Sequence, residues 1–176
     1  MRAAAALCIV CLALKSGIPL AATFGEEAVK AVYLNRFASY VYWPAESQPS
    51  AQLVIGVFGA DAVADELERL LPQPGTQNRP TVIKRVEPDN IPGSMHILYV
   101  GPGRLAEARD VLRSVERRPV LVVTDDDNGL ARGGTINFVR VNRNVRFEIS
   151  LETARRSGLQ ISAGLLSVAA RVEAVD

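Results

Sequence analysis

Hydrophobic positions recur with a helical period in residues 26–42, and strand-like apolar runs follow later in the chain. In residues 26–42 apolar and aromatic side chains return every three or four positions, which predicts a helix. We expect that helix to end at Tyr42, because Pro44 disfavours helical geometry in Trp43, the residue before it. Residues 53–58 are continuously apolar and are bounded by Gly59, a pattern typical of a buried strand.

The rest of the pattern alternates between helical and strand-like segments. Asp61 is the expected N-cap of a second helix, and the prolines in residues 72–80 predict a loop. Residues 135–141 and 145–149 alternate, and residues 142–144 join them, which predicts a hairpin with a three-residue link. Further strands are expected at residues 81–86, 96–100 and 119–124, and further helices at residues 105–115, 151–157 and 159–172.

This order of elements predicts the fold class, an α/β sandwich with a mixed sheet and helices on both faces. The apolar strands at residues 53–58 and 119–124 should lie near the centre of the sheet, and the C-terminal hairpin should form its antiparallel edge. Nothing after the N-terminal segment has the composition of a linker. Residues 23–176 are therefore expected to be a single domain.

The N-terminal segment has the layout of a secretory signal peptide. Arg2 is followed by an uninterrupted apolar run over residues 3–14, and helix-breaking Gly17 and Pro19 come before small residues. The run is shorter than the roughly 18 residues that a membrane-spanning helix needs. We expect residues 1–22 to be a signal peptide that is cleaved after Ala22, with a retained membrane anchor as the alternative.

Charge and cysteine content narrow the classes of function. The chain has 20 Lys and Arg against 19 Asp and Glu, and loss of Arg2 and Lys15 with the leader leaves 18 against 19, a net charge of −1. This balance argues against binding to nucleic acid. Cys8 and Cys11 both lie in the leader, so the exported chain has no thiol for a disulfide, a metal site or nucleophilic catalysis. We therefore expect no disulfide, no metal and no cofactor.

Two segments match known binding motifs only in part: a glycine-containing one resembles a phosphate loop, and an acidic one resembles a calcium loop. Residues 56–59 lie between a strand and a helix, but they lack the glycine and lysine pattern of phosphate loops. Asp125, Asp127 and Gly129 resemble the start of a calcium loop, whose twelfth position would be Ile136 instead of the required glutamate. An ordinary turn is the favoured interpretation of both segments.

His96 is the single histidine of the chain. It stands at the start of an apolar strand, where a hydrogen-bonded structural side chain is expected more often than a metal ligand. A Ser-His-Asp triad is formally possible, but no Gly-x-Ser-x-Gly elbow occurs in the sequence. A hydrolase that uses His96 is thus the weakest of the functions considered.

Two groups of side chains are candidate binding residues. The candidates for partner binding are the aromatic residues Tyr33, Phe37, Tyr40 and Trp43. The candidates for ligand binding are the hairpin residues Arg140, Arg143, Arg146 and Glu148. Each group has a plainer alternative. Rings on one helix can be core residues, and charged side chains on one strand face can pair with each other in solvent.

Three stretches, taken in order, resemble the YfiR family of small exported bacterial proteins. The first is Lys30-Ala31-Val32-Tyr33-Leu34, which continues to Trp43-Pro44. The second is His96-Ile97-Leu98-Tyr99-Val100, followed by the apolar residues 120–124. The third is Gly133-Gly134-Thr135-Ile136-Asn137-Phe138, followed by Val145-Arg146-Phe147-Glu148-Ile149. The likeness extends over nearly the whole exported chain.

The resemblance implies a function that composition and spacing do not reveal. It implies a periplasmic α/β domain that forms homodimers. The best-understood representative represses an inner-membrane diguanylate cyclase by acting on the periplasmic part of that enzyme. By this resemblance, the chain is a regulator and not an enzyme, and its partner is an inner-membrane signalling protein, expected to be a diguanylate cyclase. The alternative is a periplasmic sensor domain that binds a small anionic or aromatic ligand.

Two positions depart from the family pattern. Many relatives carry a cysteine immediately before the histidine of the second stretch, where this chain has Met95. Control by a disulfide is therefore not expected here. Relatives often have asparagine where this chain has Ser150, so a role of that side chain does not carry over from the resemblance.

Overall fold

The computed structural model describes residues 25–49, 51–71 and 80–174, so the expected leader and most of the expected 72–80 loop lie outside the described residues. The helices described are α1 (Glu26–Phe37), α2 (Asp61–Leu70), α3 (Arg109–Val115), α4 (Leu151–Arg156) and α5 (Ala163–Leu166), with 3-10 turns η1 (Ala45–Ser47) and η2 (Leu130–Arg132). The strands described are β1 (Val41–Tyr42), β2 (Leu53–Phe58), β3 (Thr81–Val86), β4 (Ile97–Val100), β5 (Leu121–Thr124), β6 (Ile136–Val141), β7 (Asn144–Ser150), β8 (Gln160–Ile161) and β9 (Arg171–Glu173).

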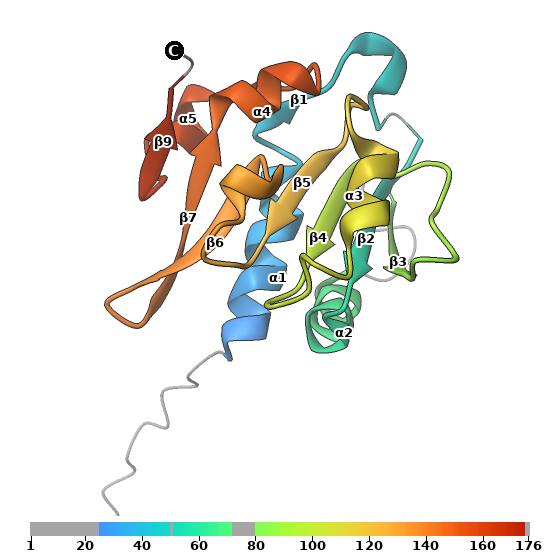
Figure 1. Ribbon diagram of the computed structural model, residues 1–176, viewed down its shortest axis with the longest axis horizontal. Helices are drawn as coiled ribbons and strands as arrows, with labels where there is room; N and C mark the ends of the chain where they lie inside the picture. The colour runs from blue at the N-terminus through green and yellow to red at the C-terminus, as the bar shows by residue number, and fades with distance from the viewer. Residues whose placement is uncertain (1–24, 50, 72–79, 175–176) are drawn as a thin grey trace, which may run out of the picture.

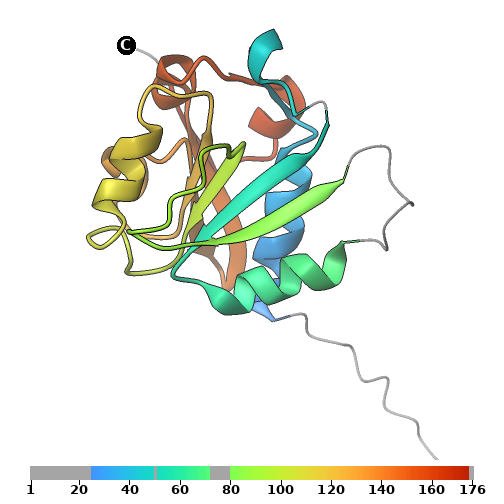
Figure 2. The ribbon, with the colours of Figure 1, turned by 90° about the vertical axis from the view of Figure 1, so that its right-hand side faces the viewer.

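A seven-stranded mixed sheet in the order β3-β2-β4-β5-β6-β7-β9 forms the centre of the protein (Figure 1). The strands from β3 to β6 run parallel, β7 is antiparallel to β6, and β9 is parallel to β7. Figure 2 shows α3, in yellow, on one side of the sheet and α1 and α2 on the other. The expected mixed α/β sandwich with helices on both faces and an antiparallel hairpin is therefore confirmed.

Two apolar layers hold the helices on the sheet. The layer under α1 and α2 includes Leu34, Phe37, Leu67, Ile97 and Phe138. The layer under α3 includes Val54, Leu98, Val111 and Val122. Every residue of β2, β4 and β5 is buried, because these strands contribute side chains to both layers. This explains why their sequences are continuously apolar and do not alternate.

The first helix is shorter than its sequence pattern predicts. It ends at Phe37, where Ser39 and Tyr40 donate backbone hydrogen bonds to Arg36 and Phe37 and tighten the last turn. The next residues extend into β1, which pairs with β8 in a separate two-stranded sheet. The predicted end at residue 42 was therefore wrong. Pairing with a strand more than 100 residues away overrides the local helical pattern.

The segment from residue 159 to residue 172 is the largest correction. A single helix was predicted, but the chain forms β8, then α5, then β9. Of the apolar positions behind that prediction, Leu165 is buried, whereas Val168 and Val172 are 54% and 37% exposed. The strand β9 pairs with β7, so the hairpin of β6 and β7 is not the edge of the sheet. Among the described helices, none is both long and apolar enough to cross a membrane.

Two local details of turns also differ from expectation. The hairpin link has two residues, Asn142 and Arg143, with φ angles of 50° and 65°, because Asn144 already pairs with Val141 in the ladder. Positive φ at both link residues is typical of tight two-residue hairpins. At the start of α2, Ala60 occupies the N-cap position and Asp61 is the first helical residue, without a side-chain capping bond.

Candidate functional site

The aromatic candidates mostly lie in the interior. Phe37 and Trp43 are 1% and 4% exposed. Tyr33 and Phe37 pack against Phe138 and Phe147, with ring centroids 5.2 to 6.0 Å apart. The structure thus brings Tyr33 and Phe37 together in an aromatic cluster between α1 and the hairpin. These rings hold α1 on the sheet.

Tyr40 differs from the other aromatic candidates because it is 40% exposed. Tyr42, two residues further along the chain, is 57% exposed, and Val41 between them is buried. Tyr40 is the turn residue immediately before β1 and Tyr42 is the second residue of that strand, so the two exposed rings lie on either side of the buried Val41 in the sequence. Tyr42 was not among the candidates, although the alternation of Tyr40, Val41 and Tyr42 could have identified it.

The charged candidates of the hairpin are spread along it and are largely engaged within the chain. Arg140 pairs with Glu26 of α1, and Arg146 donates to the Val168 carbonyl oxygen at 3.1 Å. The Glu148 carboxylate accepts from Arg171 at 2.7 Å instead of pairing with Arg146. Arg143 lies in the turn at the tip of the hairpin. The structure does not bring these four side chains together at one point.

His96 links two strands of the sheet. Its Nδ1 accepts a hydrogen bond from the Val54 backbone amide at 3.0 Å, and its own amide donates to the Val54 carbonyl oxygen at 2.9 Å. An Nδ1 atom that accepts a hydrogen bond needs a free lone pair, so the imidazole is neutral in this contact. The structural interpretation of His96 is confirmed.

A polar network that the sequence analysis did not predict lies beneath α1. The Lys30 ammonium is buried and contacts both the Glu26 carboxylate and Oδ2 of Asp125, the latter at 2.5 Å. The Tyr99 hydroxyl donates to the same Asp125 oxygen at 2.9 Å. Glu26 also accepts from Arg140, so the charges of the network balance. A lysine four residues after a glutamate was the available signal, since such pairs face each other on a helix.

The loop that carries Asp125 is held by a second set of buried polar contacts. The Asn137 side-chain oxygen accepts from the Thr124 hydroxyl at 2.9 Å and from the Asp126 amide at 3.2 Å. Gly129 and Gly134 approach the Thr124 hydroxyl so closely that a Cβ on either glycine would clash with it. Asn137 and the glycines therefore fix the loop, and the loop positions Asp125 for Lys30.

The electrostatics of the network favour a structural role over a chemical one. Burial by itself lowers the pKa of the Lys30 ammonium, but hydrogen bonds to Asp125 and Glu26 outweigh burial and raise it above its ordinary value. Burial, together with the adjacent Asp125 carboxylate, also raises the pKa of the Tyr99 hydroxyl. At neutral pH Lys30 is thus a cation and Tyr99 a hydrogen-bond donor. Neither is available as a base or a nucleophile.

Acid should weaken the network through Glu26. Burial raises the pKa of the Glu26 carboxyl, but Lys30 and Arg140 lower it to a net position below its ordinary value of 4.5. Its stabilising contribution is therefore present above about pH 4.5 and is lost as the pH falls through the lower folded pKa. The wild type should lose free energy of unfolding between pH 7 and pH 3. We expect this loss to be smaller in Glu26→Gln, by up to about 1 kcal/mol.

Urea unfolding at several pH values measures this effect. The matched control is Glu27→Gln, which removes the same charge from the exposed neighbouring position. If both variants lose the same stability as the wild type on acidification, Glu26 does not carry the acid sensitivity.

The acidic loop does not assemble a metal site. Oδ2 of Asp125 contacts Lys30 and Tyr99, and Asp126 accepts a loop hydrogen bond from the Asn128 amide at 3.3 Å. Across residues 25–49, 51–71 and 80–174, no three His, Cys, Asp or Glu side chains are grouped to hold an ion. The turn interpretation of this segment agrees with its geometry.

The position where parallel sheets of this type usually bind ligands is filled by the protein itself. The strand order reverses between β2 and β4, which places the usual crevice at the ends of these strands. There Gly101 lies against the Gly59 carbonyl oxygen, so closely that a Cβ at Gly101 would clash with it. The Arg104 side chain covers Gly59. Residues 56–58 are thus the end of β2, and Gly59 begins an ordinary strand-to-helix connection.

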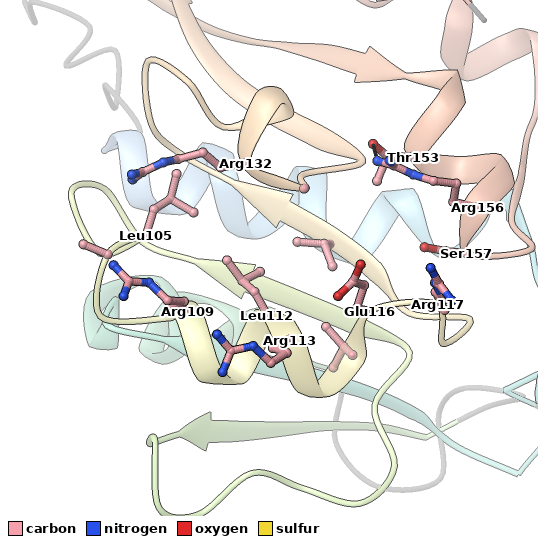
Figure 3. A pocket seen from close by; sticks show the side chains of 14 residues that line it. Leu105, Arg109, Leu112, Arg113, Glu116, Arg117, Arg132, Thr153, Arg156 and Ser157 are labelled. Atoms are coloured by element: carbon pink, nitrogen blue, oxygen red, sulfur yellow. Dashed lines mark hydrogen bonds between the residues drawn. The ribbon is translucent and has the colours of Figure 1, made fainter.

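A groove of about 640 Å³ lies on the side of the sheet that α3 covers, between α3, the end of η2 and α4 (Figure 3). Its apolar lining includes Leu105, Leu112, Val115 and Val122. Its basic lining consists of Arg109, Arg113, Arg117, Arg132 and Arg156. The sequence analysis missed this surface, although Arg109, Arg113 and Arg117 follow one another at a helical spacing of four residues.

The two departures from the family pattern have local structural roles. Met95 is buried in the layer under α3, where its sulfur lies against Gly56. Ser150 is the N-cap of α4, and its hydroxyl accepts from the Thr153 amide at 3.2 Å. Serine and asparagine are both strong N-cap residues, so the same capping role is open to either side chain.

Comparison with known protein families agrees with the resemblance seen in the sequence. A family model described as YfiR/HmsC-like matches residues 27–170. The match contains all three stretches that carry the resemblance. In the structure these stretches meet at one place, because Lys30, Tyr99 and Asn137 belong to the first, second and third stretch and all three organise the surroundings of Asp125.

Proposed function

The chain belongs to the YfiR/HmsC-like family, and on that basis we propose that it is an exported periplasmic regulator of an inner-membrane signalling protein. Proteins of this family are regulators and not enzymes. We further propose that the regulator forms a homodimer, binds the periplasmic part of its partner and represses it. The proposed partner is a diguanylate cyclase, so repression would lower cyclic-di-GMP.

The observation that carries this proposal is the family match over residues 27–170, which includes nearly all of the described fold. The interior of the protein supports it on physical grounds. Among the described residues, the buried charged side chain of Lys30 is neutralised by Glu26 and Asp125, and His96 accepts a backbone hydrogen bond. These groups hold the fold together, so we place the contacts with the partner on the surface.

Among the aromatic candidates, we propose Tyr40 as a contact residue, together with Tyr42. Tyr40, in the turn before β1, and Tyr42, in β1, are both exposed, and large exposed aromatic side chains are common at the centres of protein interfaces. Phe37 and Trp43 would contribute from below by supporting the turn that carries Tyr40. Among the hairpin residues, Arg143 is the one we propose as a ligand or partner contact.

Deletion of the gene in its host tests the proposed function. We expect the deletion to raise cyclic-di-GMP and surface attachment, because a repressor has been removed. A plasmid copy of the full chain should restore both, whereas a copy that starts at residue 23 with a new initiator methionine should not, since it lacks the expected export signal. Cyclic-di-GMP is measured by mass spectrometry. Unchanged levels in the deletion strain contradict the proposal.

A further inference from the structure

The groove beside α3 concentrates unpaired positive charge on a chain that is nearly neutral overall. The full chain has a net charge of +1. Within the described residues, the side chains of Arg109, Arg117 and Arg132 make no ion pair or hydrogen bond, although all three line the groove. By contrast, Arg140 and Arg171 elsewhere on the surface are bound by carboxylates. The guanidinium groups of the groove are therefore available to an external anion.

The remaining charges of the groove do not neutralise it. Arg113 has an exposed contact with Asp110 at 3.0 Å, and Arg156 has one with Glu152 at 4.0 Å. Exposed pairs of this kind are weak, so both arginines can exchange their partners at little cost. Glu116 is the one acidic side chain in the lining. The lining therefore keeps an excess of positive charge.

One of the unpaired arginines occupies a backbone position that glycine would fill more easily. Arg117 has a φ of 60°, in the left-handed region, which residues with a side chain rarely adopt because the side chain strains the backbone there. An arginine is thus held at the end of α3, beside the groove, in spite of its backbone conformation.

The arrangement of charge and apolar surface indicates the form of the ligand. In Figure 3, Arg109, Arg113 and Arg132 lie towards the end of the groove near Leu105, and Arg117 and Arg156 lie towards the other end. Leu112 and Glu116 lie between these two groups of arginines, and the lining also includes Val115 and Val122. A single phosphate or carboxylate is best bound by donors that converge on one point. Charges at both ends of an apolar floor suit an extended chain with acidic residues on either side of an apolar one.

We propose that this groove binds an acidic segment of the periplasmic part of the signalling protein, an inference that rests on the proposed function. An apolar side chain of the segment lies on Leu112 and Val122, and its carboxylates bind the guanidinium groups of Arg109, Arg117 and Arg132. Guanidinium groups bind carboxylates through two parallel hydrogen bonds, which orients the segment as well as attracting it.

Fluorescence anisotropy with synthetic peptides tests the groove directly. The probe is a fluorescein-labelled 12-residue peptide with Asp and Glu on both sides of a central Leu-Val pair, and the comparison peptide carries Lys at the acidic positions. We expect the wild type to bind the acidic peptide and not the basic one. Binding should weaken as NaCl is raised, because salt screens exposed charges.

A matched pair of double variants separates the groove from general charge. Arg109→Gln with Arg132→Gln removes two unpaired groove arginines, and Arg36→Gln with Arg69→Gln removes the same charge from exposed sites on α1 and α2. We expect at least a tenfold loss of peptide affinity in the first variant and less than a twofold change in the second. All four side chains are exposed, so the melting temperatures should stay close to that of the wild type.

Three outcomes would overturn the inference. The first is no binding of the acidic peptide by the wild type up to millimolar concentration. The second is an equal loss of affinity in both double variants, which would indicate general charge. The third is competition by inorganic phosphate at concentrations as low as those at which the unlabelled peptide competes, which would indicate a site for small anions.

Complementation of the deletion strain distinguishes this inference from the proposed function. The groove variant should fail to restore low cyclic-di-GMP, and the control variant should restore it. If the deletion raises cyclic-di-GMP but the groove variant restores it fully, the groove inference is wrong and the proposed function stands. If the deletion changes nothing, the proposed function fails, whatever the peptides bind.

Discussion

Phe37→Ala is expected to lower the free energy of unfolding by about 3–5 kcal/mol, the range for removal of a buried aromatic ring. The ring is 1% exposed, and its centroid lies 5.2 Å from that of Phe147 and 6.0 Å from that of Phe138. Alanine would leave a cavity where α1 meets the hairpin. Chemical denaturation monitored by circular dichroism measures the loss.

The matched control is Tyr40→Ala, which removes an aromatic side chain from the same part of the chain. Tyr40 is 40% exposed, so we expect a loss of at most about 1 kcal/mol. Weaker repression by this variant, at nearly unchanged stability, would support Tyr40 as a contact residue. If Phe37→Ala leaves the stability unchanged and weakens only the binding of the partner, Phe37 is a contact residue and its assignment to the core is wrong.

Asp125→Ala is expected to destabilise the protein by about 3 kcal/mol, because it removes one partner of a buried ion pair. The Lys30 ammonium would lose its 2.5 Å contact, and the Tyr99 hydroxyl would lose its acceptor. The pKa of Lys30 is raised in the folded state, so its contribution is present at neutral pH and is lost as the pH rises above the ordinary lysine range. Urea unfolding at pH 7 is therefore the appropriate measurement.

Asp127→Ala in the same loop is the matched control, because its side chain is exposed, and we expect a change within about 0.5 kcal/mol. A double-mutant cycle with Lys30→Met isolates the ion pair. The double variant should lose less than the sum of the single variants, by about 1 kcal/mol or more. Equal and small losses for Asp125→Ala and Asp127→Ala would show that the pair with Lys30 does not stabilise the fold.

The stretches that identify the family and the groove arginines on α3 that we propose for binding are different parts of the chain. Lys30, Tyr99 and Asn137 face the interior and fix the position of the loop after β5. The groove arginines Arg109 and Arg117 lie outside those three stretches. The interior residues of these stretches thus report on the fold, whereas the groove proposed for the partner is lined by arginines outside them.

Local patterns were sufficient where one segment by itself determines its structure. The bounds of β2 and β3 are those that the apolar runs predict, and the hairpin of β6 and β7 follows from its alternation. The pattern failed in residues 159–172. There the spacing of Ile161, Leu165 and Val168 fits a helix, but backbone pairing with β1 and β7 gives two strands and one short helix.

The candidate binding residues also divide into features that local sequence predicts and features that contacts between distant segments decide. The sequence identified aromatic residues and hairpin arginines by type and spacing, yet burial places Phe37 and Trp43 in the core and ion pairing engages Arg140 and Glu148. The burial of Lys30 depends on Asp125, which lies 95 positions further along the chain. A charged side chain that looks solvent-exposed in a helical pattern can be buried when a distant segment supplies the opposite charge.

By itself the sequence determined the α/β class, the helices on both faces and the family, because apolar periodicity and local motifs are properties of consecutive residues. Only the tertiary structure decided which aromatic rings are exposed, which charges neutralise one another and where arginines from α3, η2 and α4 line one groove. Those properties depend on distances between segments that are far apart in the chain, and local spacing does not encode such distances.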